Sequence, residues 1–115
     1  MHKRRVTFLL AVSFLGLFMI ACKRQNIGDI NADPGSFRDK EVNVGGTVIQ
    51  SFGVLNTGIY QIDDGTGRMW VFSDSRGVPS KGSTVGVKGR IVPTLTFLGV
   101  NYATVMRESD RRSGS

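Results

Sequence analysis

The residues whose types could take part in chemistry lie mainly in one stretch, residues 60–72, where apolar and polar side chains alternate around a predicted turn. Asp63 and Asp64 are adjacent carboxylates, which can bind a metal ion or act as acid and base, but no base or nucleophile accompanies them. Asp and Gly are also the residues of tight hairpin turns, where Asp accepts backbone N–H bonds and Gly takes unusual φ angles. We therefore interpret Asp63, Asp64, Gly65 and Gly67 as a structural turn between two strands.

Aromatic residues beside this turn form the candidate ligand-binding face. Strands over Ile59–Ile62 and Arg68–Ser73 have side chains that alternate between two faces. Burying Arg68 in a small core would be costly, so its face is predicted to point outward. The predicted interior residues are Tyr60, Ile62, Met69 and Val71. The candidate binding residues are Ile59, Gln61, Arg68, Trp70 and Phe72, with Lys88 and Arg90 as a neighbouring basic strip. Outward aromatics can stack bases, or the N-terminal segment or the 74–83 loop can simply cover Trp70.

The counts of histidine and cysteine exclude several kinds of site. The only histidine is His2 and the only cysteine is Cys22. One cysteine cannot form an intramolecular disulfide. Because His2 falls in the segment that we expect to be removed as a leader, the mature domain is predicted to have no Ser-His or Cys-His catalytic pair and no His/Cys zinc site. We expect no catalysis, no metal and no cofactor.

The first 22 residues have the pattern of an export signal. A basic start, His2–Arg5, precedes 16 uncharged and mostly apolar residues, Val6–Ala21, and then Cys22. That run is shorter than the roughly 20 residues of a membrane-spanning helix. Ala21-Cys22 after an apolar run resembles the lipobox of bacterial lipoproteins. The resemblance implies that residues 1–21 are a signal peptide, and that Cys22 carries acyl chains, palmitate among them. It also implies a lipid anchor in the cell envelope, in the outer membrane if the host has one, since residue 23 is not Asp.

The rest of the chain is predicted to be a short tether, residues 22–26, one β-domain, residues 27–107, and a disordered tail, residues 108–115. One helical turn near Ile27 and Ile30 precedes Pro34, and Phe37 is expected to close one end of the core. Three further strands are expected at Glu41–Phe52, Thr84–Val92 and Phe97–Met106, with a turn at Pro93–Thr96. Gly45-Gly46 predicts a bulge or bend that lets one long strand serve two sides of a barrel.

Together these features resemble the OB-fold, a five-stranded Greek-key barrel. The resemblance rests on Val42-x-Val44-x-Gly46-x-Val48 and on the Tyr60–Val71 stretch around the Asp-Asp-Gly-Thr-Gly turn. That turn is similar to those of anticodon-binding and replication-protein OB domains. The lead-in from Ile27 to Phe37 is similar to that of small exported bacterial OB-fold proteins. The resemblance implies an all-β domain that binds a ligand on the face of its second and third strands.

Charge separates the functional hypotheses. The chain carries 15 Lys and Arg against nine Asp and Glu, but residues 27–107 hold eight against seven. A nearly neutral domain lacks the basic footprint of a strong nucleic-acid binder. We expect a membrane-anchored module that binds a protein, peptide or glycan of the envelope. A nucleic-acid-binding domain and a structural lipoprotein of an envelope assembly are the alternatives.

Overall fold

The computed structural model describes residues 24–113, so the predicted signal peptide and the lipidation of Cys22 lie outside the described residues. The described chain begins with a short helix, a 3₁₀ turn and then five strands. These elements are α2 (Ile27–Ala32), η1 (Pro34–Phe37), β1 (Glu41–Val54), β2 (Thr57–Asp63), β3 (Arg68–Ser73), β4 (Thr84–Phe97) and β5 (Val100–Ser113). Neither helix in this part of the chain is long and apolar enough to cross a membrane.

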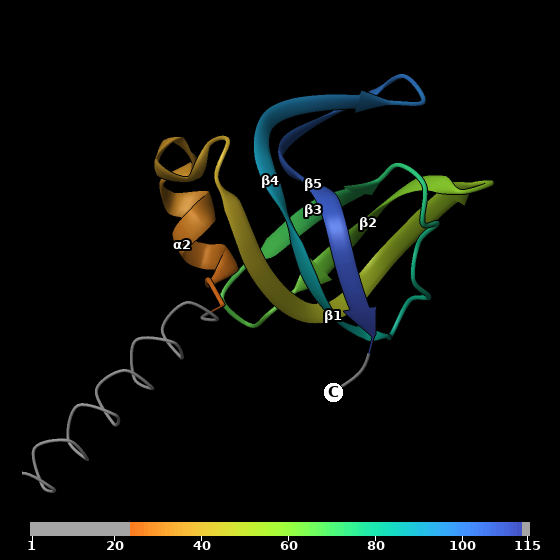
Figure 1. The fold of residues 1–115 in the computed structure, drawn as a ribbon, viewed down its shortest axis with the longest axis horizontal. Helices are drawn as coiled ribbons and strands as arrows, with labels where there is room; N and C mark the ends of the chain where they lie inside the picture. Colours follow the sequence, from red (N-terminus) through yellow and green to blue (C-terminus); the bar gives the residue numbers. More distant parts are fainter. Residues whose placement is uncertain (1–23, 114–115) are drawn as a thin grey trace, which may run out of the picture.

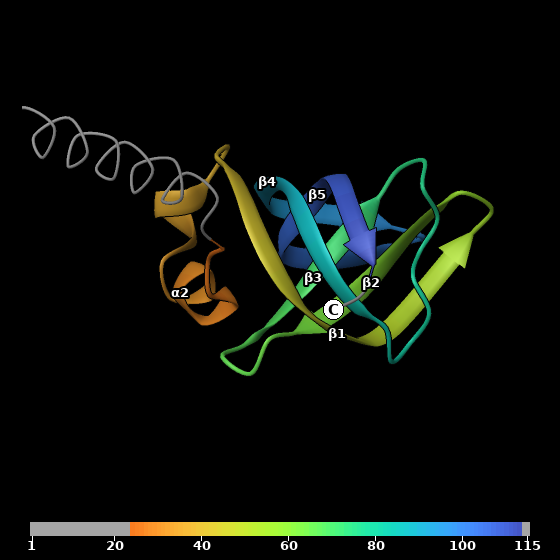
Figure 2. The ribbon, with the colours of Figure 1, turned by 60° about the horizontal axis from the view of Figure 1, so that its bottom comes forward.

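The five strands close into one barrel in the order β1-β2-β3-β5-β4 (Figure 1). All neighbours are antiparallel except β3 and β5, which run parallel. The predicted all-β, five-stranded barrel with a short N-terminal helical turn is therefore confirmed. Figures 1 and 2 show α2 at one end of the barrel and the tips of the β1–β2 and β4–β5 hairpins at the other.

Strand β1 is long and bent, and it serves two sides of the barrel as predicted. Residues Glu41–Thr47 pair with β4, and Thr47–Val54 pair with β2. The bulge lies at Ile49, where the register shifts, rather than at the predicted glycine pair. Gly46 instead permits close contact, because a Cβ there would lie 2.5 Å from the carbonyl oxygen of Asp63.

The barrel core follows the predicted alternation. The four predicted interior side chains, Tyr60, Ile62, Met69 and Val71, are buried. Ile27 and Ile30 of α2 are fully buried and Phe37 packs against the same cluster, as predicted. The helix and η1 therefore close one end of the barrel with apolar side chains.

Strand β4 continues through Pro93–Thr96, so the turn predicted there is wrong. The turn falls instead at Leu98 and Gly99, whose φ angles are +50° and +82°, between the paired residues Phe97 and Val100. Two positive φ angles give a turn whose twist suits a hairpin. The resulting hairpin extends beyond the barrel, and we call its segment from Val92 to Val105 the arm.

The disordered tail predicted from residue 108 is wrong for residues 108–113. Strand β5 runs to Ser113 and pairs with β4, Lys88 opposite Asp110 and Val85 opposite Ser113. Its apolar alternation is broken at Thr104, whose φ is +53°, so that the adjacent Val105 and Met106 are buried in different clusters. The domain therefore extends past its predicted end at residue 107.

Candidate functional site

Residues Asp63–Gly67 form the turn between β2 and β3. Gly65 has a φ of +88° and its N–H donates to Asp63 Oδ1 at 2.8 Å. Asp64 accepts four hydrogen bonds, from the backbone N–H groups of Ile27 (2.9 Å), Thr66 (2.8 Å) and Gly67 (3.2 Å) and from the Thr66 hydroxyl (2.6 Å). Its carboxylate thus joins the turn to the start of α2 and has little capacity left for a ligand.

Hydrogen bonding decides the ionisation of Asp64. Desolvation by burial is the largest single influence and raises its pKa, but the bonds from Ile27, Thr66 and Gly67 together lower the pKa below the usual value. Gly67 does not adopt the predicted unusual φ. Gly67 instead lies close against α2, because a Cβ there would lie 3.2 Å from the Gly28 nitrogen.

A buried polar cluster, which the sequence did not predict, fixes β5 inside the barrel. The Glu108 side chain is 1% exposed, and its carboxyl group accepts hydrogen bonds from the Tyr60 hydroxyl (2.5 Å) and the Ser73 hydroxyl (3.2 Å). Arg111 pairs with it at 2.9 Å and lies over the Tyr60 ring. Burial, followed by the bond to Glu108, raises the pKa of Tyr60 far above its usual value, so the phenol remains a donor.

The candidate aromatic face is largely covered, and the arm covers it. Ile59 faces away from the barrel core, as predicted, but is only 1% exposed because it packs with Leu95 and Val105 in a second apolar cluster. Trp70 lies edge-on to Tyr102, with ring centroids 5.0 Å apart. Among residues 24–113, the side chains that pack on this face come from the arm, whereas the N-terminal segment or the 74–83 loop was predicted to cover Trp70; Lys81 of that loop lines the neighbouring groove with Trp70.

A groove remains open beside this covered face. It has a volume of about 390 Å³ and is lined by Ile49, Gln50, Ser51, Phe52, Ile59, Trp70, Lys81 and Tyr102. Gln61 borders the same face, since it pairs with Trp70 in the β2–β3 ladder and bonds Gln50 at 3.4 Å. The groove combines aromatic edges with amide groups and one ammonium group.

Two of the three charged members of the predicted site lie on a different strand from its aromatic residues. Arg68 is exposed and pairs with Asp63 at 3.3 Å, beside the turn. Arg90 donates to the carbonyl oxygen of Asp39, and Lys88 lines a different groove, on the β1–β4–β5 face. The structure therefore brings Ile59, Gln61, Trp70 and Phe72 together, with Arg68 next to Trp70 on the same face of β3, and places Lys88 and Arg90 on another strand, β4.

The largest exposed apolar residues gather at the hairpin end of the barrel. Leu55 is 96% exposed and Leu98 is 61% exposed, each at a hairpin tip. Phe52 of β1 contacts Phe97 of β4, with ring centroids 6.3 Å apart, so the two hairpins meet. We call the exposed set the hairpin patch, and it consists of Phe52, Val54, Leu55, Leu98 and Val100.

Both leucines of the hairpin patch have left-handed backbone conformations. The φ angle is +59° at Leu55 and +50° at Leu98. This conformation costs a side chain with a Cβ roughly 1–2 kcal/mol, and Gly or Asn would avoid most of that cost. Backbone preference therefore does not explain the leucines at these two exposed tips. The sequence offered only a weak signal, apolar residues next to Asn56 and Gly99.

Comparison with known proteins supports the architecture. No family model and no curated protein matches this sequence. Among solved structures, the chain is similar to OBody AM3L09 bound to hen egg-white lysozyme, with a TM-score of 0.58 and 18% identity over 79% of this chain and 94% of that one. The fold is an OB-fold. The chain is also similar to asparaginyl-tRNA synthetase from Pyrococcus horikoshii, with a TM-score of 0.52 and 17% identity over 68% of this chain and 20% of that one.

These likenesses describe the OB-fold barrel alone, because both identities are below a fifth of the aligned residues. This fold carries many unrelated functions, so function has to be argued from the surfaces of this chain. Two surfaces stand out on the OB-fold described here, the hairpin patch with its adjoining groove and the basic β1–β4–β5 face.

Proposed function

We propose that this protein is a lipid-anchored OB-fold module of the cell envelope, without catalytic activity, whose hairpin patch binds another protein. The observation that carries the proposal is the exposure of five large apolar side chains at the end of the barrel opposite α2. Large apolar side chains exposed at one end of a domain are typical of a protein-binding site. The OBody structure, in which an OB-fold binds lysozyme, supports a protein as the partner of such a barrel.

The position of the tether suits this arrangement. The described chain starts beside α2, where the Gln25 N–H donates to the Asn43 carbonyl oxygen at 2.8 Å. An anchor at Cys22 would therefore attach near the end of the barrel opposite the hairpin patch (Figure 1). In the proposed arrangement the patch lies at the end of the barrel far from the anchor and stays accessible to other proteins of the envelope, and the outer membrane is the favoured location in a host that has one.

The anchor has a direct test. Mass spectrometry of the protein purified from its host membrane should find Lys23 preceded by a diacylated and N-acylated Cys22. The Cys22→Ser variant should lack those lipids and accumulate with residues 1–21 still attached. An unmodified Cys22 in the wild-type protein would exclude the lipoprotein.

The patch is tested by exchanging its strained leucines. Leu55→Asn with Leu98→Asn removes apolar contact at positions whose backbone Asn tolerates, and should weaken partner binding about tenfold or more. The matched control is Asp39→Asn, because Asp39 has a φ of +61° but lies at the α2 end. Crosslinking of the membrane-bound protein, followed by quantification of the trapped partner, measures the effect. Equal trapping by all three proteins would contradict a partner on this surface.

The groove beside Trp70 supports a second candidate, binding of a single-stranded nucleic acid. Its aromatic edges and Lys81 are the group types that stack bases and contact phosphates. A tRNA synthetase among the similar structures shares the fold. If this candidate is correct, Trp70 fluorescence should be quenched by single-stranded oligonucleotides, with an affinity that falls steeply as salt increases. Quenching that does not depend on salt would contradict it.

A further inference from the structure

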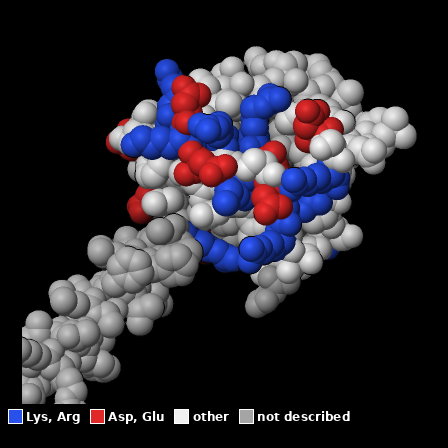
Figure 3. Space-filling view, in the orientation of Figure 1, with Lys and Arg blue, Asp and Glu red and all other residues white. Residues whose placement is uncertain are grey.

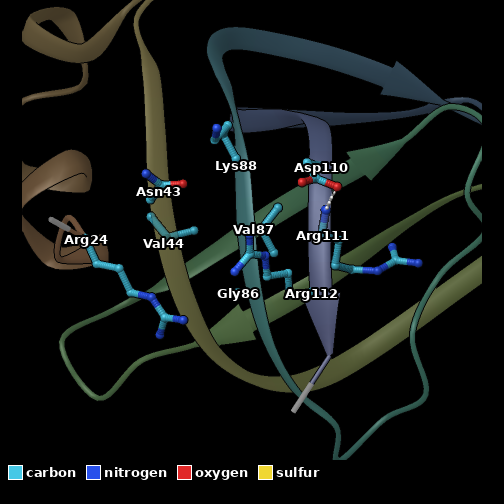
Figure 4. Close-up of a pocket in the computed structure, with 9 residues that line it drawn as sticks. All are labelled: Arg24, Asn43, Val44, Gly86, Val87, Lys88, Asp110, Arg111 and Arg112. Carbon is cyan, nitrogen blue, oxygen red and sulfur yellow. Dashed lines mark hydrogen bonds between the residues drawn. The ribbon is translucent and has the colours of Figure 1, made fainter. Parts of the chain in front are cut away.

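A basic groove on the β1–β4–β5 face is separate from the hairpin patch. It has a volume of about 370 Å³, and Figure 4 shows its lining residues on β1, β4, β5 and the segment before α2. The three cations that the argument uses are Arg24, Lys88 and Arg112, each of which is exposed. Figure 3 shows Lys and Arg gathered over this face, with acidic side chains between them.

The acidic residue of this groove is already engaged. The Asp110 carboxylate accepts from the Arg111 backbone N–H at 2.9 Å and from Arg76 at 2.9 Å, and these two bonds, in that order, lower its pKa. Arg111 itself turns inward to Glu108. Among residues 24–113, neither Arg24, Lys88 nor Arg112 forms an ion pair. Three cations therefore remain available to an anion.

Arg24 lies across a floor of two glycines. A Cβ on Gly45 or Gly86 would collide with the Arg24 guanidinium, and at Gly86 no other side chain or backbone atom would be met within 4 Å. The planar guanidinium thus lies close to β1 and β4, and no ion pair within residues 24–113 involves it. Arginine in this setting suits the bidentate binding of a phosphate group.

We propose that this groove binds the phosphate headgroups of anionic phospholipids and orients the anchored domain on the bilayer. The inference rests on the proposed lipid anchor, because Arg24 follows Cys22 by two residues and so lies within about 7 Å of it along the chain. Basic residues close to an anchor strengthen its attachment to an anionic surface. The β1–β4–β5 face then lies against the membrane, and the hairpin patch remains open to a protein.

Lysine footprinting of the mature lipoprotein on vesicles tests this orientation. The protein is reconstituted on phosphatidylcholine vesicles with and without phosphatidylglycerol and treated with an amine-reactive, membrane-impermeant reagent. Labelling of Lys88 should fall about fivefold on the anionic vesicles and recover in high salt. Lys40 and Lys81, exposed and outside the groove, are internal controls and should not change.

Two variants assign the protection to the groove. Arg24→Gln with Arg112→Gln removes two exposed cations and should abolish most of the Lys88 protection. Gly86→Ala should reduce the protection by displacing only the Arg24 guanidinium. Equal labelling of Lys88 on both vesicle types would overturn the inference while leaving the anchor intact. Protein that does not remain on the vesicles would overturn the anchor and the inference together. Protection by inorganic phosphate on neutral vesicles would show a soluble-phosphate site and overturn the membrane orientation.

Discussion

The two ends of the barrel differ in how completely their groups are satisfied. At the α2 end, Ile27 and Ile30 are fully buried and the Asp64 carboxylate accepts four hydrogen bonds. At the hairpin end, Leu55 and Leu98 are exposed in left-handed conformations that leucine disfavours. The α2 end is closed by buried apolar and hydrogen-bonded groups, and the hairpin end leaves apolar side chains exposed, which is where we propose that a partner protein binds.

The barrel wall between the two ends should show the largest effect on stability. Arg111→Ala leaves the buried Glu108 carboxyl group without its cation, and should lower the free energy of unfolding by about 3–5 kcal/mol. The matched control is Arg112→Ala, an exposed neighbour whose loss should change stability by less than about 0.5 kcal/mol. Urea denaturation measures both. Similar losses in the two variants would mean that the Glu108 cluster does not hold β5 in place.

The closed end should show the next largest effect. Asp64→Ala removes the acceptor of four hydrogen bonds between the turn and α2, and should cost about 1–3 kcal/mol. Because the pKa of Asp64 is lowered in the folded state, its contribution is present above about pH 4 and lost as the pH falls through the lower folded-state value. Denaturation measured between about pH 2 and 7, a range that spans the ordinary carboxyl pKa, should therefore show the unfolding free energies of wild type and Asp64→Ala converging at the acidic end.

Asp29→Asn is the control for that comparison. Asp29 is an exposed residue of the same helix, and none of the described hydrogen bonds involves its side chain. Its replacement should leave both the stability and the pH profile close to those of the wild type. A difference between wild type and Asp64→Ala that stays constant down to low pH would show that the carboxylate acts through packing rather than charge.

The hairpin end should show the smallest effect on the free energy of unfolding, and a substitution there should leave it unchanged or increase it. Leu98→Asn relieves the left-handed leucine and should leave the free energy of unfolding unchanged or raise it by up to about 1 kcal/mol. Thermal unfolding checks this value. A loss of more than about 1 kcal/mol would place Leu98 in the folding core and remove the contrast between the two ends.

The sequence predicted the closed end well because its signals are local. The alternation around the Asp-Asp-Gly-Thr-Gly turn is contained within 13 residues and identified the interior side chains from Tyr60 to Val71. The apolar pair Ile27 and Ile30, three residues apart, identified the buried side of α2.

The arm and the end of β5 could not be predicted in the same way. Pro93 resembled a turn residue, yet β4 continues through it to Phe97 and the turn follows at Leu98 and Gly99. Glu108 and Arg111 resembled a solvated tail because Tyr60, 48 residues away from Glu108, explains their burial only after folding. The arm packs against Trp70 and partly covers the predicted aromatic face. The apolar side chains that remain most exposed are therefore those of the hairpin patch.

Site-specific photocrosslinking in the native membrane tests directly whether the hairpin end binds another protein. A photoreactive amino acid is placed at Leu98, in the hairpin patch, or at Lys40, an exposed residue at the α2 end. If a partner binds the hairpin patch, position 98 should give one discrete protein adduct, which Leu55→Asn should weaken, and position 40 should give no such adduct. The same adduct from both positions, or none from position 98, would contradict a protein-binding hairpin end.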